Sequence, residues 1–185
     1  MKKLEIRIAK KEDASRLLEI YAPYVKTTPI TFEYEVPSLE EFQTRIETIS
    51  ESYPYLVAVV EGEIAGYAYA TAFKSRAAYQ WAVETSIYLD GNFHGKGIAR
   101  ALYEKLEAIL KRQNIYTLSA CITNPNNQSI SFHEKSGYLT VAHFHKCGFK
   151  LGQWRDVVWM EKTLQDHPAI PEPMIPFSDI SCDFQ

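Results

Sequence analysis

The sequence predicts a single mixed domain of the α+β class, in which strands and helices follow one another along the chain. Three observations support this prediction. Apolar residues alternate with polar ones in some segments and recur at helical spacing in others. Two apolar runs flank a short turn at residues 61–63, as in a β-hairpin. A length of 185 residues suits one domain, because domains commonly hold ~100–200 residues.

The first third of the chain is predicted to contain one strand and two helices. Leu4, Ile6 and Ile8 alternate with polar residues and indicate a half-buried strand. The apolar residues of the first helix are Ala14, Leu17, Leu18 and Tyr21. Ser38 and Glu41 have the spacing of a capping box, which starts the second helix. We expect the buried stripe of that helix to consist of Leu39, Phe42, Ile46 and Ile49.

The remaining elements follow from the same signals. Residues 55–60 and 64–71 are expected to form the hairpin, and residues 84–89 the next strand. A helix begins at Ile98, a short strand covers residues 117–121, and a helix at 127–136 ends before Gly137. Two late strands, at about 139–149 and 156–162, complete the domain, which we assign to residues 1–165.

Residues 166–185 form a proline-rich tail. Four prolines preclude a regular helix or a central strand there: Pro168, Pro171, Pro173 and Pro176. A disordered tail is one interpretation. The apolar residues Met174, Ile175, Phe177 and Ile180 favour the other, in which the tail packs on the domain or on a subunit partner.

Composition excludes several classes of partner. A net charge of −3 gives no electrostatic reason to expect binding to nucleic acid or to an anionic membrane. No apolar run approaches the ~20 residues that span a bilayer. The first residues lack the apolar segment of a signal peptide. Cys121, Cys147 and Cys182 have neither metal-binding nor redox spacing, so we expect reduced thiols and a cytoplasmic protein.

The segment from Ile87 to Leu102 carries the strongest functional signal. It is predicted to run from a strand through a loop with Gly95 and Gly97 into a helix. Glycines at a helix start let backbone N–H groups approach an anion, and the helix dipole favours a phosphate there. The segment lacks the P-loop pattern, so Lys96 is not a P-loop lysine, and it lacks the third glycine of a dinucleotide-binding turn.

Glu84 is the first candidate catalytic residue. It lies within a run of apolar and β-forming residues. On an edge strand its carboxylate would face solvent and have no function. In a cleft between strands, loss of hydration would raise its pKa and suit it to accept a proton from an ammonium group.

A second candidate group combines cations with aromatic rings. Lys74 and Arg76 precede Tyr79 and Trp81. An ordinary solvated loop is the alternative interpretation. As a site, the arginine offers a planar fork to an anion, the lysine adds a point charge, and the aromatic rings form the walls.

His143, His145 and Cys147 alternate along one predicted strand, and they invite a metal-site interpretation that geometry opposes. Alternate side chains on a strand are ~6.6–7 Å apart, so the outer two would be ~13 Å apart. Zinc–ligand bonds are only ~2.0–2.3 Å long, so the three cannot share one ion. We therefore expect no metal site.

The loop and the segments around it resemble the GNAT acyl-CoA N-acyltransferases. The pyrophosphate loop of that superfamily reads Gln/Arg-x-x-Gly-x-Gly/Ala, and residues 94–99 match it with His94 at the first position. Nearly the full length of the chain is similar to the phosphinothricin N-acetyltransferase branch. The segments that carry this resemblance are residues 22–32, 53–58, 73–79, 84–89, 133–138 and 147–157.

The resemblance implies a fold and a co-substrate. We expect the GNAT fold: a mixed, mostly antiparallel sheet with helices on both faces and a splayed strand pair that admits acetyl-CoA. The pantetheine arm would lie along Ile87, Tyr88 and Leu89. The residues expected at the pyrophosphate are Gly95, Lys96, Gly97, Ile98, Ala99 and Arg100, and Asn126 would hold the distal arm. No metal is required by this chemistry.

The resemblance also suggests a role for His133. Residues 126–138 match the superfamily pattern Asn-x-x-Ala…Tyr-x-x-x-Gly-Phe, and His133 stands where that pattern has a tyrosine near the leaving thiolate. A histidine there can exchange protons near neutral pH. It could act with Glu84 or protonate the thiolate, and the sequence does not decide between these roles. A single histidine on a helix is more often structural.

The implied substrate is a small, glutamate-like amino acid: phosphinothricin, methionine sulfoximine or methionine sulfone. Residues expected to bind it are Phe32, Lys74, Arg76, Tyr79 and Tyr88. Another small amine, a protein N-terminus, or a non-catalytic acyl-CoA-binding role are the alternatives. The resemblance further implies a homodimer, which the aromatic-rich first third of the chain and the apolar tail residues support.

Overall fold

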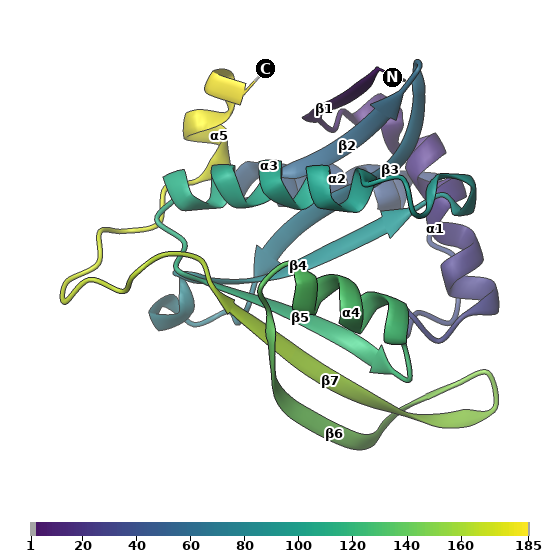
Figure 1. Ribbon diagram of the computed structural model, residues 1–185. Helices are drawn as coiled ribbons and strands as arrows, with labels where there is room; N and C mark the ends of the chain where they lie inside the picture. Colours follow the sequence, from purple (N-terminus) through teal and green to yellow (C-terminus); the bar gives the residue numbers. More distant parts are fainter. Residues whose placement is uncertain (1–2, 185) are drawn as a thin grey trace.

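The computed structural model describes residues 3–184, which form a seven-stranded sheet with helices on both faces (Figure 1). The strand order is β1-β2-β3-β4-β5-β7-β6. Every neighbouring pair is antiparallel except β4 and β5, which are parallel. The strands are β1 (Leu4–Ile8), β2 (Tyr55–Val60), β3 (Glu63–Ala72), β4 (Ala82–Leu89), β5 (Thr117–Asn124), β6 (Leu139–Lys150) and β7 (Gln153–Thr163). The predicted fold class is confirmed.

Four helices of nine or more residues pack on this sheet. They are α1 (Ala14–Thr27), α2 (Leu39–Ser52), α3 (Ile98–Arg112) and α4 (Asn127–Lys135), and the short α5 (Phe177–Ile180) lies near the C-terminus. Each helix predicted from the sequence is present. The capping box at the start of α2 is also confirmed, because the Glu41 N–H donates to Ser38 Oγ at 3.2 Å and the Ser38 N–H donates to Glu41 Oε2 at 2.7 Å.

The two faces of the sheet have separate apolar cores. Helices α1 and α2 cover one face, with residues such as Leu17, Ile20 and Phe42 packed against β2 and β3. Helix α3 covers the other face, with Leu102 and Leu106 fully buried. The helical periodicity in the sequence therefore identified the buried faces of these helices.

Leu39 is an exception to the predicted stripe of α2. Its side chain is exposed, whereas Phe42 and Ile46 are buried and Ile49 is partly buried. Leu39 is the first residue of the helix, and helical side chains lean toward the N-terminus. Its side chain therefore projects past the end of the helix, and the expectation that it is buried was wrong.

The proline-rich tail packs on the domain of its own chain. The Trp81 indole N–H donates to Glu172 O at 2.7 Å, and Gln113 Nε2 donates to Ile175 O at 2.7 Å. Phe177 is 1 % exposed and belongs to the core beside α3. The expectation that prolines preclude a helix in the tail was wrong for residues 177–180, because α5 begins directly after the last proline, Pro176.

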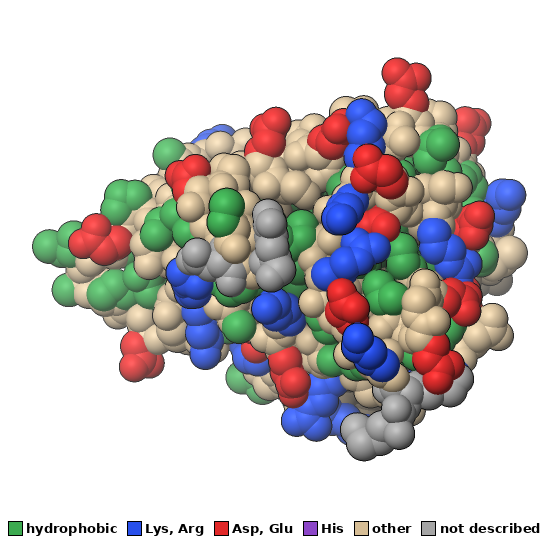
Figure 2. All heavy atoms as spheres, turned by 90° about the horizontal axis from the view of Figure 1, so that it is seen from above, with side chains coloured by type: hydrophobic (Ala, Val, Ile, Leu, Met, Phe, Trp, Pro, Cys, Tyr) green, Lys and Arg blue, Asp and Glu red, His purple; other side chains and the backbone are tan. Residues whose placement is uncertain are grey.

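The surface carries mixed charges. Acidic and basic side chains are interspersed over the face seen from above (Figure 2), in keeping with the small net charge of the chain. Among residues 3–184, no helix is long and apolar enough to cross a membrane.

Candidate active site

The sheet opens between β4 and β5. These strands pair over only three positions, Ala82 with Thr117, Val83 with Leu118, and Glu84 with Ser119. Both strands then continue for five residues without pairing to each other, because β4 runs to Leu89 and β5 to Asn124. The splayed strand pair that the resemblance implied is therefore present. It leaves one edge of residues 85–89 in β4 unpaired with β5.

A cavity of about 370 Å³ lies at the mouth of this opening. It is lined by the end of β4, by the loop before α3 and by the start of α4. Its lining includes most of the residues expected to bind acetyl-CoA: Ile87, Leu89, Gly95, Gly97, Ile98, Ala99, Arg100 and Asn126. Tyr88 lines instead a smaller cavity of about 60 Å³ between the splayed strands.

Lys96 does not line either of these two cavities. Its Nζ donates to Asn92 O at 2.6 Å and lies 4.9 Å from the centre of the Phe93 ring. Its contacts therefore hold the loop together. The role predicted for Lys96 at the pyrophosphate stays a prediction that rests on sequence resemblance.

The two glycines of the loop have left-handed backbone conformations. Gly95 has φ +72° and Gly97, the N-cap of α3, has φ +78°. Residues with side chains rarely adopt such angles. Open space surrounds both positions, so the backbone conformation itself requires glycine here. The turn leaves the first N–H groups of α3 at the cavity, where an anion is favoured.

Glu84 is the last residue of β4 that pairs with β5, so its side chain lies where the opening begins. The carboxylate is half-buried, and burial raises its pKa, while the positive charge of Lys74 acts in the opposite direction. Within residues 3–184, no hydrogen bond or ion pair within 4.0 Å engages this carboxylate. It is therefore an available base beside an open strand edge.

Lys74 and Tyr79 belong to an aromatic cluster beside Glu84. Lys74 Nζ lies 4.9 Å from the centre of the Phe73 ring and 5.5 Å from that of Trp159. The Phe73 ring packs edge-on against Tyr79 and Trp159. These contacts position the ammonium group near Glu84 by cation–π attraction.

Arg76 is exposed on the loop between β3 and β4 and caps a short 3-10 helix at Ala77–Tyr79. The structure places Arg76 two residues from Lys74 on this loop. No contact brings the two side chains together within the described residues. The anion clamp predicted from these two cations stays a prediction.

His133 is buried at the inner end of the opening, with 3 % of its surface exposed. Its Nδ1 donates to Ser129 O at 2.8 Å, and its Nε2 lies 3.0 Å from the Tyr103 hydroxyl oxygen. Burial lowers the pKa of the imidazole, and the hydrogen bond to Ser129 partly offsets this. The ring is therefore held neutral near pH 7.

Thr85 links His133 to the base of the opening. The Tyr103 hydroxyl also lies 3.3 Å from Thr85 Oγ1, which donates to Ser119 O on β5 at 3.2 Å. Thr85 and Glu84 are consecutive residues of a strand, so their side chains point to opposite faces of the sheet. His133 and Glu84 thus lie on opposite sides of the sheet, and their contacts are separate.

The loop between α1 and α2 lies beside the opening and is hydrogen-bonded to β6. Buried Lys150 donates to the carbonyl oxygens of Thr31 and Glu33, and the Tyr34 hydroxyl donates to Phe149 O at 2.5 Å. The exposed Phe32 ring lies against Gly148, where a Cβ would be only 2.2 Å from it. Phe32 thus lies over β6, and its role at the substrate stays a prediction.

Tyr88 belongs to a cluster of tyrosines on the α1 side of the sheet. Its ring lies 4.9 Å from the ring of Tyr21, 5.3 Å from Tyr24 and 5.4 Å from Tyr67. Burial raises the pKa of Tyr88 well above its usual value. The Tyr24 hydroxyl donates to Leu89 O at 2.5 Å, so this cluster also holds the end of β4 in place.

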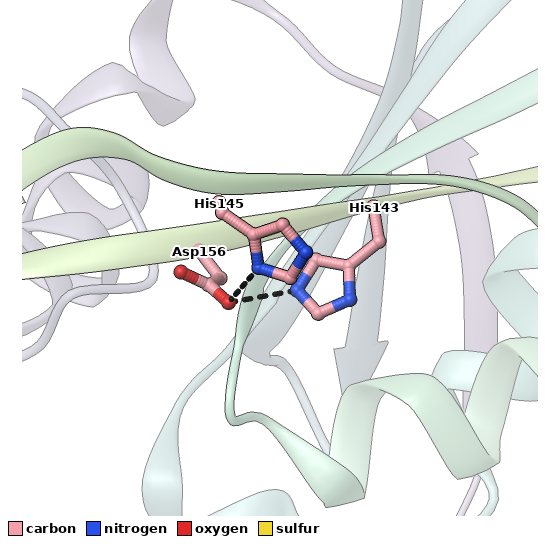
Figure 3. A group of neighbouring side chains, drawn as sticks. All are labelled: His143, His145 and Asp156. Atoms are coloured by element: carbon pink, nitrogen blue, oxygen red, sulfur yellow. Dashed lines mark hydrogen bonds and ion pairs between the residues drawn. The ribbon is translucent and has the colours of Figure 1, made fainter.

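His143 and His145 lie together with Asp156 of β7, and the three ligand atoms are within 4.8 Å of one another (Figure 3). Cys147 is not part of this group, in keeping with the expectation that it cannot share one ion with the two histidines. The spacing argument considered β6 alone, whereas Asp156 comes from the neighbouring strand. Asp156 lies two residues from Val158, the partner of His143, so it shares a face with both histidines.

Sequence reasoning missed three residues of the site. Tyr103 lies 30 positions before its partner His133 and reads as one more apolar residue of α3. Phe73, directly after β3, and Trp159 of β7 carry the cation–π contacts of Lys74, yet they lie 86 residues apart in sequence. No local pattern in the sequence indicates that residues so far apart are in contact.

Comparisons with known proteins agree with this geometry. A family model described as an acetyltransferase (GNAT) domain matches residues 6–159. A phosphinothricin N-acetyltransferase of Streptomyces viridochromogenes is 33% identical over 96% of each chain. An L-methionine sulfoximine/L-methionine sulfone acetyltransferase of Salmonella typhimurium is 29% identical over 90% of this chain and 98% of its own.

A solved structure is also similar over the whole length. It is a GNAT-superfamily phosphinothricin acetyltransferase from Sinorhizobium meliloti in complex with acetyl-CoA, with a TM-score of 0.88, 34% identity, and coverage of 95% of this chain and 97% of that one. A sheet that splays at its one parallel strand pair beside a glycine-bearing helix start defines the class of acyl-CoA-dependent transferases. The chain belongs to the acetyltransferase (GNAT) family.

Proposed function

We propose that the protein transfers the acetyl group of acetyl-CoA to the α-amino group of a small, glutamate-like amino acid such as phosphinothricin, methionine sulfoximine or methionine sulfone. The enzyme is an acetyl-CoA-dependent N-acetyltransferase, since the family model and curated relatives over nearly its full length have this activity. The observation that carries the proposal is the half-buried, unpaired carboxylate of Glu84 at the point where β4 and β5 separate.

The residues around the larger cavity fit acetyl-CoA. The N–H groups at the start of α3 suit the pyrophosphate, and the free edge of β4 suits the amide groups of the pantetheine arm, which can pair with it as a further strand would. The co-substrate supplies an activated thioester. The thioester carbonyl would then lie in the gap between β4 and β5, beside Glu84 on one side and the Tyr103 hydroxyl on the other.

Glu84 acts as the base in this mechanism. It accepts a proton from the substrate ammonium group, directly or through a water molecule, and the free amine attacks the thioester carbonyl. A C–N bond forms, the attacking nitrogen loses its second proton to solvent, the C–S bond breaks, and CoA leaves as a thiolate. Backbone N–H groups near Tyr88 and Leu89 stabilise the charge that develops on the carbonyl oxygen. Most of the rate enhancement comes from holding the two reactants in this geometry.

His133 serves the leaving thiolate through Tyr103. Its contacts favour this role over partnership with Glu84, because its Nε2 contacts the Tyr103 hydroxyl on the face of the sheet opposite to Glu84. The hydroxyl is placed to donate a hydrogen bond to the thiolate, which takes its proton from solvent. A neutral imidazole is suited to orient the hydroxyl in this way.

The substrate pocket is proposed to lie on the outer side of the opening. Phe32 and Tyr79 form its apolar walls, and Lys74 and Arg76 bind the anionic groups of the amino acid. The proximity of Lys74 to Glu84, seen in its effect on the pKa of that carboxyl, supports this arrangement. An anion held there would place the α-amino group within reach of the base.

A thiol-release assay tests the proposed function. Free CoA is measured with a thiol reagent while phosphinothricin, methionine sulfoximine, methionine sulfone, glutamate and a short peptide with a free N-terminus are supplied at equal concentration. We expect the first three to give the highest kcat/KM. A higher value for the peptide would assign the enzyme to protein N-termini. Acetyl-CoA binding with no turnover of any amine would indicate a binding module.

We also propose that the protein is a cytoplasmic homodimer. The support for a dimer comes from the β5–β7–β6 part of the sheet, whose exposed apolar side chains include Leu139, Val141, Phe144, Phe149 and Trp154. Covering such a patch with a second copy removes it from water. All three cysteines are free, which fits a reducing compartment. Light scattering that reports a monomer at working concentration would contradict the dimer.

A further inference from the structure

The β6–β7 hairpin carries a group of side chains that the acetyl-transfer chemistry does not use. His143 and His145 come from β6 and Asp156 from β7, and their rings and carboxylate converge on one point at the surface (Figure 3). His143 Nε2 lies 2.8 Å and His145 Nδ1 3.0 Å from the same oxygen, Asp156 Oδ2. The two imidazole rings are 4.3 Å apart.

We propose that His143, His145 and Asp156 form a binding site for a divalent transition-metal ion such as Zn²⁺. Two imidazole nitrogens and one carboxylate oxygen are a ligand set that such ions prefer. The remaining coordination positions would be filled by water, because the site is open: the side chains of His143 and His145 are 39% and 75% exposed.

The geometry needs little adjustment to hold an ion. Tetrahedral zinc with bonds of ~2.0–2.2 Å places neighbouring ligand atoms on the order of 3.3 Å apart. The nitrogen–oxygen separations of 2.8 and 3.0 Å therefore have to increase by only a few tenths of an ångström. An ion would replace the two N–H protons that now point at Asp156 Oδ2.

Asp156 is prepared for this role by its surroundings. Its second oxygen, Oδ1, accepts the Lys146 backbone N–H at 2.8 Å, which fixes the carboxylate and leaves Oδ2 toward the histidines. The carboxylate is thus oriented before any ion arrives, as supporting hydrogen bonds do in metal sites.

The backbone of the hairpin explains why these residues meet. The pairing of β6 with β7 is irregular between Phe144 and Gly148, and Lys146 has φ +49°. His145 lies two residues from His143 on β6, and Asp156 lies two residues from Val158, the partner of His143, so the three side chains share one face. An ion at this point would join the bulge to β7 and stabilise the hairpin. On its other side the hairpin carries Phe144, whose partner is Val157 of β7.

The test uses the untagged full chain and Zn²⁺ or Co²⁺ as probes. We expect calorimetry to detect one bound ion per chain and the cobalt complex to show a visible absorption band. His145→Gln should weaken binding by more than the ~10–100-fold that loss of a supporting residue costs. Zn²⁺ should also raise the melting temperature of the wild type and leave that of His145→Gln unchanged.

Two matched variants serve as controls. His167→Gln removes an exposed histidine that contacts Thr117 and Tyr116, far along the chain from the hairpin, and should leave affinity unchanged. Cys147→Ser should also bind normally, because its thiol contacts Arg155 O instead. No saturable binding, equal affinity in His145→Gln, or loss of binding in Cys147→Ser would each overturn the proposal.

Discussion

The two parts of the sheet differ in how they are covered. Strands β1 to β4 have α1 and α2 on one face and α3 on the other, and both cores are built mainly there. Of strands β5, β7 and β6, only β5 and β7 contribute to the core on the α3 side, through residues that include Leu118, Val158 and Met160. On their other side Cys121 and Phe144 are exposed. One part of the sheet is closed, and the other is left open for a partner or a ligand.

The proposed chemistry lies on the line between these two parts. Glu84 is in the last pair that joins β4 to β5, and the cavity begins directly beyond it. On the face covered by α3, Thr85 of β4 donates a hydrogen bond to Ser119 O of β5, and the hydroxyls of Tyr103 and Tyr138 contact Thr85. A rigid closed part therefore positions the base, while the open part provides access.

Glu84→Gln should reduce kcat by ~10²–10⁴-fold, which is the usual contribution of a positioned acid or base. The affinity for acetyl-CoA should stay the same, because the co-substrate is proposed to bind on β4 beyond this residue. The loss should become smaller as the pH rises and more substrate amine is already deprotonated. Steady-state kinetics from pH 6 to 9 and a separate binding measurement check both expectations.

Glu40→Gln, an exposed glutamate on α2, is the matched control and should retain wild-type kinetics. A Glu84→Gln enzyme with near wild-type kcat at every pH would remove this residue from the mechanism. Acetyl transfer would then take place away from the boundary between the two parts of the sheet.

A pair of leucine substitutions tests the difference between the parts directly. Leu102 on α3 is fully buried, whereas Leu139 on β6 is 73 % exposed. Leu102→Ala should lower the free energy of unfolding by ~2–5 kcal/mol, because it leaves a cavity in a closed core. Leu139→Ala should change it by no more than about 0.5 kcal/mol. Urea denaturation of both variants at equal protein concentration makes the comparison.

Light scattering on the same two variants tests whether a second copy covers the open part of the sheet. If a second copy covers the open part, Leu139→Ala should weaken self-association while Leu102→Ala does not. A large loss of folding stability in Leu139→Ala at concentrations where the protein is monomeric would mean that the open part is closed by contacts of its own chain.

Much of this architecture could be predicted from local sequence signals. The periodicity of α3, the capping box at Ser38 and the turn at Gly62 each depend on residues close together in the chain, and all three are present in the structure. The splay between β4 and β5 was predicted only through family resemblance. Local patterns specify a strand, but they do not state which neighbour it pairs with or where the pairing ends.

Contacts between distant residues account for what was missed. The partner of His133 is Tyr103, and the third member of the histidine group is Asp156. Periodicity identifies neither partner, because the pairing of β6 with β7 and the contact between α3 and α4 bring these residues together. Leu39 is a further example, at the end of a helix. It continues the apolar pattern of α2, but it lies beyond the surface that buries the other residues of that pattern.

Arg76→Ala tests the proposed role of the loop between β3 and β4 in substrate binding. Removing a charged hydrogen bond to the substrate should weaken amino-acid binding by about 1.5–3 kcal/mol, with acetyl-CoA affinity unchanged. Competition calorimetry with methionine sulfone and with acetyl-CoA separates the two ligands. Lys111→Ala, an exposed cation on α3, is the control. If acetyl-CoA binding falls instead, Arg76 belongs to the co-substrate site.

The smallest expected effect is on the pH dependence of the free energy of unfolding, through His133 on the α3 side of the sheet. Burial lowers the pKa of His133 in the folded protein, so the unfolded chain takes up the proton first as the pH falls. The free energy of unfolding should therefore decrease as the pH falls from ~6.5, the ordinary value for histidine, toward the lower folded value. His133→Gln should reduce this slope, whatever its effect on stability at pH 8. His167→Gln, which removes an exposed imidazole, should keep the wild-type slope. Urea denaturation at half-unit pH intervals measures this slope. Equal slopes in the wild type and His133→Gln would mean that the surroundings of His133 accommodate a charged imidazole and are not closed to water as its burial implies.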